Sequence, residues 1–354
     1  MVTSEKELEE RRAALQRWWR DQPSEPDDAT LGPLVPASSG FSNETYLFDL
    51  VGYENPGIPE RSYVVRCMPS GAVLLPDYDL RFQYDVMREL GSTTVPVPRP
   101  IAYEADDTVL GSPFFIMEKV EGVVASGRYP GFHGHGLFFD ATLARREQMW
   151  WEAVDVMAAL HRLDWQRLEL PSSVGSPETV DEAVAAEAAK IGRWLDWADL
   201  GPLPVLEEGL EYVTKTSCAA KRLVLCWGDA RPGNIIYRDG HVASVLDWEL
   251  AYLAPPEFDL AYFTLIDGVT AEINQVPRLA GIPEAAATAA HYERVTKHPL
   301  EAWDFAQIFQ ALRLGALLVL AVHMSPPNLN YVDDFLTNNI PTHRLAELLG
   351  KTQT

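Results

Sequence analysis

Two short segments near the middle of the chain limit most strongly what it can fold into. WGDARPGN occupies residues 227–234, and LDWE follows at residues 246–249. The turn-forming sequence Arg238-Asp239-Gly240 separates two apolar runs and predicts a β-hairpin. Short apolar runs of the kind found in strands lie at 223–226, 234–237 and 242–248. The sequence therefore predicts a loop, a hairpin and a carboxylate, Asp247, at the far end of the hairpin.

Three polar residues of these segments, Asp229, Asn234 and Asp247, have the spacing of a phosphate-transfer site. An Asp, an Asn five positions later and a second Asp after the next strand resemble the catalytic loop of protein kinases. Mg²⁺ prefers a few hard oxygen ligands, which Asn234 and Asp247 would supply. Asp229 would accept the proton of the attacking hydroxyl. Arg231 stands where protein kinases place a lysine, and we expect it to neutralise charge on the transferred group.

The pattern Asp-x4-Asn is common by itself, and acidic residues near turns usually face solvent or cap a neighbour. The rest of the chain strengthens the interpretation, because other motifs follow in a family-like order. They are SGFSNETYLFDL (39–50), YVVRCMP (63–69), TVPVPRPI (94–101), LGSPFFIMEKVEGV (110–123), AALHRLDW (158–165) and PPEFDLAYF (255–263). Over roughly residues 35–330 the chain therefore resembles the aminoglycoside phosphotransferase and choline kinase-like family, in the branch with a WGDxRxGN loop.

This resemblance implies an α+β, bilobal fold of the protein-kinase type. Residues 1–34 would form an N-terminal helix and linker, and 35–117 a small nucleotide-binding lobe with an antiparallel sheet. Residues 118–122 would be the hinge, and 123–354 a mostly helical large lobe with the catalytic loop and the acceptor site. ATP and Mg²⁺ would bind between the lobes. Independently of the resemblance, the apolar periodicity of residues 5–22 predicts an amphipathic helix that docks onto the body.

The residues that the resemblance places near the nucleotide depart in part from the family pattern. No GxGxxG is present, and the loop at 38–43 has a single glycine, so it is also compatible with a plain turn. Arg66 stands where kinase-like folds carry a phosphate-binding lysine, and Gln83 where the family often has its glutamate partner. The predicted nucleotide-binding residues are Ser39, Gly40, Ser42, Asn43, Arg66, Gln83, Glu118 and Val120.

Arg66 and Gln83 together predict a changed phosphate clamp. Gln83 cannot form an ion pair, but it can accept a hydrogen bond from Arg66. Glu89 is the alternative partner on the same predicted helix. The loop also begins with Trp227 where the family commonly has His, and we expect the indole to fill the same space. Asp259, in the DLA segment, is expected to brace the catalytic loop.

A segment rich in glycine and aromatic residues follows the hinge at 126–140. It predicts a mobile flap over the acceptor site. Its two histidines, His133 and His135, are interpreted as loop surface rather than as metal ligands, because no third ligand is nearby. The helices expected at 180–197 and 300–322 would enclose the rest of the acceptor pocket. The apolar walls of the flap would come from Tyr129, Phe132, Phe138 and Phe139.

Composition excludes several classes of partner. The 354 residues carry 51 Asp plus Glu against 29 Lys plus Arg, a formal charge of −22, so we expect neither nucleic acid nor a membrane as a partner. The acidic surplus is compatible with a cationic substrate, but solubility explains it more simply. Three cysteines without CxxC spacing argue against disulfides and predict a cytoplasmic protein. The expected oligomeric state is a monomer or a homodimer.

Three functional hypotheses follow from the sequence. The first is an antibiotic kinase of the aminoglycoside phosphotransferase type, which would confer antibiotic resistance. The second is a kinase of a hydroxylated metabolite, such as a hydroxy acid, an acyl thioester or a sugar. The third is a nucleotide-binding pseudoenzyme, which the changes at Arg66, Gln83 and Trp227 suggest, although Asp229, Asn234 and Asp247 argue against it. All three share a site for ATP and Mg²⁺, and the first two add a small-molecule hydroxyl acceptor.

Overall fold

The structure is a computed structural model that describes residues 4–22, 30–37, 44–51, 62–69, 71, 73–324 and 334–350. Its strands are β1 (Thr30–Leu31), β2 (Val35–Pro36), β3 (Glu44–Val51), β4 (Ser62–Cys67), β5 (Pro100–Glu104), β6 (Phe114–Glu118), β7 (Val123–Val124), β8 (Val224–Cys226), β9 (Ile235–Arg238), β10 (His241–Val245) and β11 (Tyr252–Ala254). Its α-helices are α1 (Glu5–Arg20), α2 (Leu80–Leu90), α3 (Leu137–Asp140), α4 (Leu143–Leu160), α5 (Val180–Ala198), α6 (Pro204–Lys215), α7 (Glu257–Ile273), α8 (Ala285–Thr296), α9 (Trp303–His323) and α10 (Ile340–Leu348). Short 3₁₀ turns lie at η1 (Trp165–Arg167), η2 (Ser172–Val174), η3 (Pro232–Asn234) and η4 (Trp248–Leu250).

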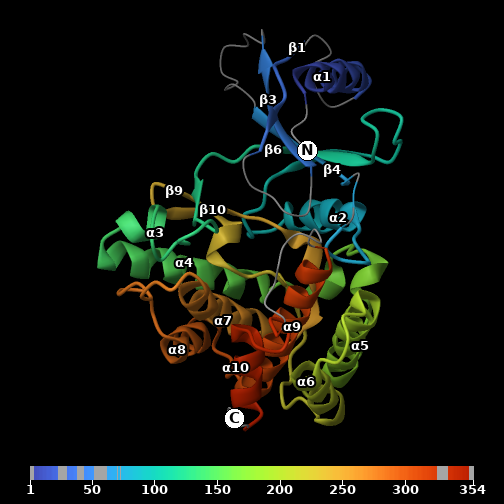
Figure 1. Cartoon of the computed structure of the whole chain (residues 1–354). Helices are drawn as coiled ribbons and strands as arrows, with labels where there is room; N and C mark the ends of the chain where they lie inside the picture. The colour runs from blue at the N-terminus through green and yellow to red at the C-terminus, as the bar shows by residue number, and fades with distance from the viewer. Residues whose placement is uncertain are drawn as a thin grey trace.

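The small lobe is an antiparallel sheet with the strand order β1-β3-β4-β6-β5, to which β2 adds by pairing with β3. Figure 1 shows α1 beside this sheet at the N-terminal end of the molecule. Helix α1 begins at a capping box, in which the Ser4 hydroxyl accepts from the Glu7 amide and the Glu7 carboxylate accepts from the Ser4 amide. The expected N-terminal helix is therefore present. It is built into the small lobe together with β1.

Alternation along the central strands explains why the sheet has a helix on each face. In β4, Tyr63 and Val65 are buried in the cluster that includes Leu15 and Trp19 of α1. Val64, between them, points to the other face and belongs to the cluster that contains most of the buried side chains of α2. Successive residues of a strand face opposite sides, so one strand serves both helices. The second cluster continues into the large lobe and joins the two lobes.

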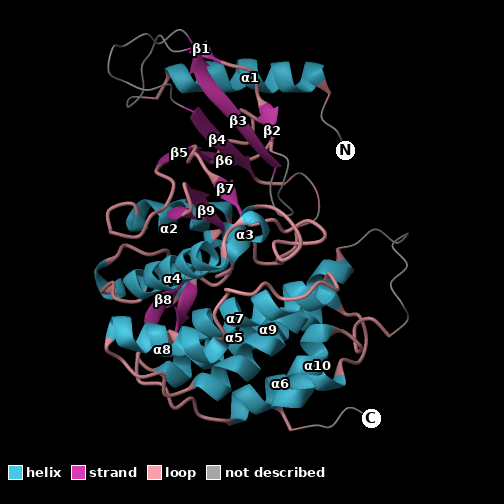
Figure 2. Cartoon of the chain, turned by 90° about the vertical axis from the view of Figure 1, so that its left-hand side faces the viewer, coloured by secondary structure: helices cyan, strands magenta, loops and turns pink. Residues whose placement is uncertain are grey.

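The large lobe is mostly helical, as Figure 2 shows. Helix α9 passes through its centre, and Phe305, Phe309 and Leu312 are buried against the neighbouring helices. Among the described helices, α9 is long and apolar enough to span a membrane by length and composition, yet 67 % of its most apolar window is buried inside the lobe. A helix that is apolar all round and enclosed by other helices is typical of a protein core.

The segments 227–234 and 246–249 lie in a chain circuit that starts at β8 and ends at β11, the strand paired with β8. Strand β8 leads into the loop at 227–231, η3 and the β9–β10 hairpin, and the chain returns through η4 to β11, which pairs antiparallel with β8. At the hairpin turn Asp239 and Gly240 both have positive φ, +54° and +77°, which the Asp-Gly sequence favours. The pairing of β8 with β11 brings the two ends of this 31-residue circuit (224–254) side by side.

Gly228 allows the circuit to close. Its φ is +87°, and a Cβ at this position would overlap the carbonyl oxygen of Leu250 in the returning segment. We expect Gly228→Ala to destabilise the protein by more than about 3 kcal/mol, because the added methyl meets backbone and the conformation is unfavourable for an L side chain. Denaturant unfolding monitored by circular dichroism would measure this loss.

Gly268→Ala is a matched control with the opposite expected sign. Gly268 lies inside α7, and a Cβ there would meet nothing within 4 Å. Replacing a glycine of a helix interior with alanine stabilises by about 0.5–1 kcal/mol. Equal effects of the two substitutions would show that the close approach at Gly228 does not hold the circuit together.

Candidate active site

The catalytic loop predicted at 227–234 is fixed by one buried carboxylate of α7. Asp259 is 1 % exposed, and it accepts hydrogen bonds from the amides of Trp227 (2.6 Å) and Gly228 (2.9 Å). Its Oδ2 also lies 3.1 Å from Nε2 of His161, which is part of the predicted AALHRLDW motif. The expected brace is confirmed, and His161 supports it from the C-terminal cap of α4.

Trp227 has a clear role in place of the family's usual histidine. The indole is 1 % exposed, and its Nε1 donates to the carbonyl of Leu246 at 2.7 Å. Leu246 in turn donates its amide to the carbonyl of Asn234 at 2.8 Å. These two bonds connect the loop to the residue before Asp247, so the three predicted polar residues are held in one region.

Asp229 has a donor on each carboxylate oxygen. Oδ2 accepts from Nε of Arg231 (2.9 Å) and Nδ2 of Asn234 (2.6 Å), and Oδ1 accepts from the hydroxyl of Tyr262 (2.8 Å). Burial favours the neutral acid, but the charge of Arg231 and the three hydrogen bonds outweigh it and hold the pKa of Asp229 below its ordinary value. The carboxylate is therefore ionised at neutral pH and kept in one orientation.

Asn234 and Asp247 flank the hairpin, one before β9 and the other after β10. The amide nitrogen of Asn234 is used by Asp229, which leaves its Oδ1 as the atom directed elsewhere. Asp247 has left-handed backbone angles, φ 58° and ψ 68°, which aspartate tolerates better than most residues. Its Oδ1 accepts from Nη1 of Arg66 at 2.8 Å. This ion pair connects β4 of the small lobe to the far end of the hairpin.

The clamp around Arg66 differs from the expectation. Oε1 of Gln83 is buried and accepts no hydrogen bond in the described part of the chain, so the predicted bond from Arg66 is wrong. Gln83 instead donates through Nε2 to Glu249 and to the hydroxyl of Tyr78, both at 3.2 Å. Burial alone would lower the pKa of Arg66, but the charges of Asp247 and Glu249 raise it. Carboxylates of the LDWE segment thus replace the helix glutamate.

Glu89, the alternative partner, lies elsewhere. Its carboxylate pairs with Arg88 and accepts from the amide of Glu169. Glu249, which accepts from Gln83, was not predicted; it lies two residues after Asp247, and its place in the LDWE segment is the one sequence signal for it. The Gln83 side chain is fully buried and donates a hydrogen bond to Glu249, so it supports that carboxylate rather than facing a ligand.

The predicted hinge at 118–122 lies within the described residues, whereas the predicted phosphate-covering loop at 38–43 does not. Ser39, Gly40, Ser42 and Asn43 lie outside the described residues. Glu118 ends β6; its amide donates to the carbonyl of Arg99 at 2.9 Å, and its side chain pairs with the same residue. Val120 follows in the connection to β7 and is half-buried. Their contact with an adenine ring remains a prediction.

The segment at 126–140 differs from the expected flap in its aromatic side chains and in His133. Phe132 and Phe138 are buried core residues rather than pocket walls, whereas Tyr129 and Phe139 are exposed. Phe138 packs edge to face against Tyr237 of β9, and Phe132 packs in the same way against Phe138. His135 pairs with the Ser126 hydroxyl at 2.9 Å.

His133 was expected on the loop surface, but it is 2 % exposed. Its Nδ1 accepts from the amide of Leu279, and its Nε2 lies 3.0 Å from the carbonyl of Asp267. His133 is thus buried by contacts with Asp267 and Leu279, which lie far away in the sequence.

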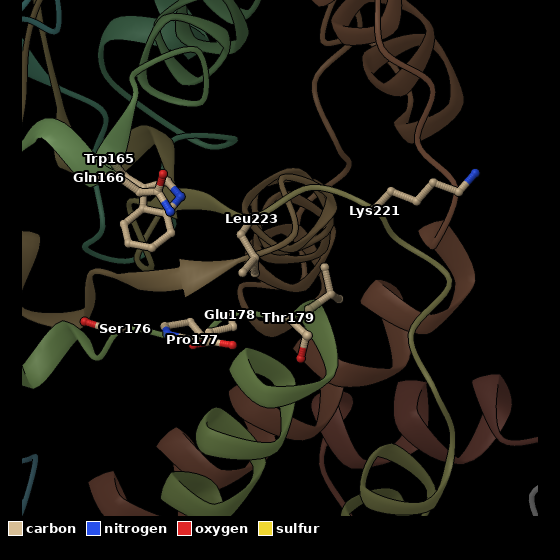
Figure 3. A pocket seen from close by; sticks show the side chains of 9 residues that line it. Trp165, Gln166, Ser176, Pro177, Glu178, Thr179, Lys221 and Leu223 are labelled. Atoms are coloured by element: carbon tan, nitrogen blue, oxygen red, sulfur yellow. The ribbon is translucent and has the colours of Figure 1, made fainter.

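The large lobe contains a cluster of potential metal ligands and a cavity, and neither forms part of the predicted site. His161, Cys226 and Asp259 place potential metal ligands within 4.8 Å of one another, but the first and third already hold the catalytic loop. A cavity of about 600 Å³ opens beside Leu223 (Figure 3). Leu223 precedes β8, whereas the catalytic loop follows that strand, so this cavity is not the predicted acceptor pocket. Its other lining residues are Trp165, Gln166, Ser176, Pro177, Glu178, Thr179, Val180 and Lys221.

Comparison with solved structures agrees with the bilobal α+β fold. A protein from Ralstonia eutropha JMP134, provisionally described as an aminoglycoside phosphotransferase, superposes with a TM-score of 0.69 at 24 % identity and covers 97 % of this chain and 99 % of its own. An aminoglycoside phosphotransferase in ternary complex with ADP and hygromycin B gives a TM-score of 0.52 at 17 % identity, over 91 % of this chain and 94 % of its own. These likenesses confirm the predicted fold.

Sequence comparison identifies the family. The mouse (Mus musculus) protein named acyl-CoA dehydrogenase family member 10 is 25 % identical over 299 residues, which are 80 % of this chain and 26 % of that protein. The chain thus spans about a quarter of the length of the curated relatives it matches. The model of the phosphotransferase enzyme family matches residues 33–309, well over half of the chain. The chain belongs to the phosphotransferase enzyme family.

Proposed function

We propose that the chain transfers the γ-phosphoryl group of ATP to a hydroxyl group of a small molecule. The observation that carries this proposal is the environment of Asp229, a carboxylate that is ionised and held by Arg231, Asn234 and Tyr262. Such a group can orient a hydroxyl and accept its proton. The ADP complex of a structural neighbour supports the choice of nucleotide for this fold.

The donor set at the hairpin fits Mg²⁺. Asn234 has its amide nitrogen on Asp229, so its oxygen is the atom available as a ligand. Asp247 contributes a second hard oxygen from its carboxylate, which Arg66 contacts at Oδ1 before a ligand binds. Oxygen ligands from an amide and a carboxylate suit this ion, which when bound would neutralise charge on the nucleotide phosphates. We assign Asn234 and Asp247 as its ligands.

The residues of this chain divide the reaction among them. The acceptor oxygen forms a bond to the γ-phosphorus while the bond from that phosphorus to the β,γ-bridging oxygen breaks, and ADP leaves. Asp229 orients the hydroxyl and takes its proton. Arg231, whose pKa the neighbouring Asp229 raises, remains charged and stabilises the transferred group. Arg66 would exchange Asp247 for nucleotide phosphates, which a guanidinium binds through two parallel hydrogen bonds.

The segment that begins at β7, beside the catalytic loop, exposes several apolar side chains. Of the nine large apolar side chains that the described part of the chain exposes, five lie between residues 123 and 143. The segment lies close to the catalytic loop, since β7 pairs with β9 and a Cβ at Gly233 would lie 3.7 Å from the Ala125 carbonyl and 3.2 Å from Nη1 of Arg231. Exposed apolar side chains gathered beside a site favour an apolar ligand. They are Val123, Val124, Tyr129, Phe139 and Leu143.

Among the acceptors considered, a hydroxylated acyl thioester agrees best with this surface. The curated relatives carry acyl-CoA dehydrogenase in their names, and an acyl chain would cover the exposed valines and aromatic rings. An aminoglycoside carries several ammonium groups and no long apolar part, so it would leave these side chains in water. The antibiotic-resistance hypothesis is therefore the less favoured one.

Asp229→Asn tests both the reaction and the pseudoenzyme hypothesis. The amide keeps the shape but cannot accept the proton, so we expect kcat to fall by about 10²–10⁴-fold. The assay follows Mg²⁺-dependent ADP release with a medium-chain hydroxyacyl thioester, the matching free hydroxy acid, choline and an aminoglycoside as acceptors. We expect kcat/KM to be highest for the thioester.

The non-hydroxylated acyl thioester is the control for uncoupled ATP hydrolysis. Preferred phosphorylation of the aminoglycoside would contradict the assignment of the acceptor but keep the reaction. ATP binding without transfer to any of the hydroxylated compounds, in the wild type as in Asp229→Asn, would favour the pseudoenzyme.

Arg66→Met tests the phosphate contact separately. Methionine occupies a similar path but has no charge, so we expect KM for ATP to rise by about 10-fold or more while kcat falls less, since charge-assisted hydrogen bonds to the phosphates are lost. Steady-state kinetics at saturating acceptor would measure both constants. Arg88→Met, on the exposed side of α2, is the control; an equal rise of KM there would argue against a specific contact.

A further inference from the structure

A buried arginine of α9 holds the catalytic loop from behind. Arg313 is 0 % exposed and forms no ion pair with any residue that the structure describes. Its Nη1 donates to the carbonyl of Gly228 at 2.5 Å, and its Nη2 lies 3.4 Å from the carbonyl of Leu250. No described carboxylate contacts the guanidinium directly, although the charges of Glu187 and Asp229 act on it from farther away. Burying a cation in this way is costly, so its retention in a core helix suggests a role beyond packing.

Arg313 and Asp259 act on the same residue from opposite ends. The amide of Gly228 donates to Asp259, and the carbonyl of Gly228 accepts from Arg313. That carbonyl belongs to the peptide bond that leads into Asp229. The Cα position of Asp229 is therefore fixed by the guanidinium of a helix more than eighty residues away in the chain.

Tyr262 extends this support to the carboxylate itself. Its ring centroid lies 5.9 Å from Cζ of Arg313, and its hydroxyl donates to Oδ1 of Asp229 at 2.8 Å. Oδ2 already accepts two hydrogen bonds, from Arg231 and Asn234. A carboxylate oxygen has two lone-pair directions. With one direction of Oδ1 taken by Tyr262, the other remains for the hydrogen of an acceptor hydroxyl.

We propose that Tyr262 and Arg313 are positioning residues that orient Asp229, so that its Oδ1 receives the proton of the acceptor. The inference rests on the proposed function, since it takes Asp229 as the proton acceptor. Neither side chain needs to touch nucleotide or acceptor, because both act through Asp229 or the peptide before it. Their substitution should therefore change kcat and leave the KM for ATP unaltered.

Tyr262→Phe is the first test. It removes the hydroxyl but keeps the ring against Arg313, and we expect kcat to fall by about 10-fold to 100-fold with the KM for ATP within about twofold of the wild type, because a misplaced catalytic group costs rate rather than binding. Arg313→Lys keeps the charge but lacks the planar fork that spans two carbonyls, and we expect a fall in kcat of the same kind.

Tyr252→Phe is the matched control. Tyr252 is also buried, its ring lies 4.7 Å from Cζ of Arg313, and its hydroxyl accepts from Gln310 rather than contacting Asp229. We expect its kcat to equal that of the wild type. Equal losses of kcat in Tyr252→Phe and Tyr262→Phe, in step with their melting temperatures, would reduce Tyr262 to a packing role and overturn the proposal.

A structural measurement tests the inference without depending on turnover. In a crystal structure of Tyr262→Phe we expect the Asp229 carboxylate to turn about its Cβ–Cγ bond relative to a wild-type crystal structure. An unchanged orientation would overturn the proposal. If Asp229→Asn abolishes transfer while Tyr262→Phe keeps the full kcat, the positioning role fails and the proposed function stands. If the wild type transfers phosphate to no acceptor, the proposed function fails, and the carboxylate orientation alone decides on the role of Tyr262.

Discussion

The carboxylate of Asp259 is the contact on which the rest of the site depends. It accepts hydrogen bonds from the amides of Trp227 and Gly228, the two residues that precede Asp229, the proposed proton acceptor. Buried amides without partners are costly, so the two hydrogen bonds to Asp259 favour this path of the loop. Along it, the backbone of Gly228 approaches the carbonyl of Leu250 closely. The loop geometry therefore follows from a helix that comes later in the chain.

Charge balance is the second organising constraint. Acidic side chains meet at the hairpin from two directions, Asp229 from the loop before it and Asp247 and Glu249 from the turn η4 after it. Arginines from different elements compensate them: Arg231 beside Asp229, and Arg66 beside Asp247. Arginine suits these places because its guanidinium stays charged when buried and donates in several directions. A chain with a formal charge of −22 thus places some of its few cations next to the carboxylates that need them.

Short-range patterns predicted the parts of the site that depend on local sequence. The Asp-Gly turn and the apolar runs were sufficient to predict the hairpin. The family-like DLA segment was sufficient to predict the brace by Asp259. The partner of Arg66 could not be predicted in this way, because Arg66 and Asp247 are 181 residues apart and neither segment indicates the other. His133 was misjudged for the same reason: its neighbours Asp267 and Leu279 belong to distant segments. Arg313 lies in an apolar helix without a motif, so only the fold shows its contact with Gly228.

The ion pair between Arg66 and Asp247 has a consequence for how ligands enter. It is formed across the two lobes and places a cation of the protein on a carboxylate assigned to a metal. A divalent ion that binds Asp247 would therefore replace a counter-ion already present rather than add charge to a bare acidic pocket. The displaced guanidinium would then bind the anionic phosphates that arrive with the metal. Metal and nucleotide together would replace the ion pair between Arg66 and Asp247, so each should bind more weakly alone than with the other.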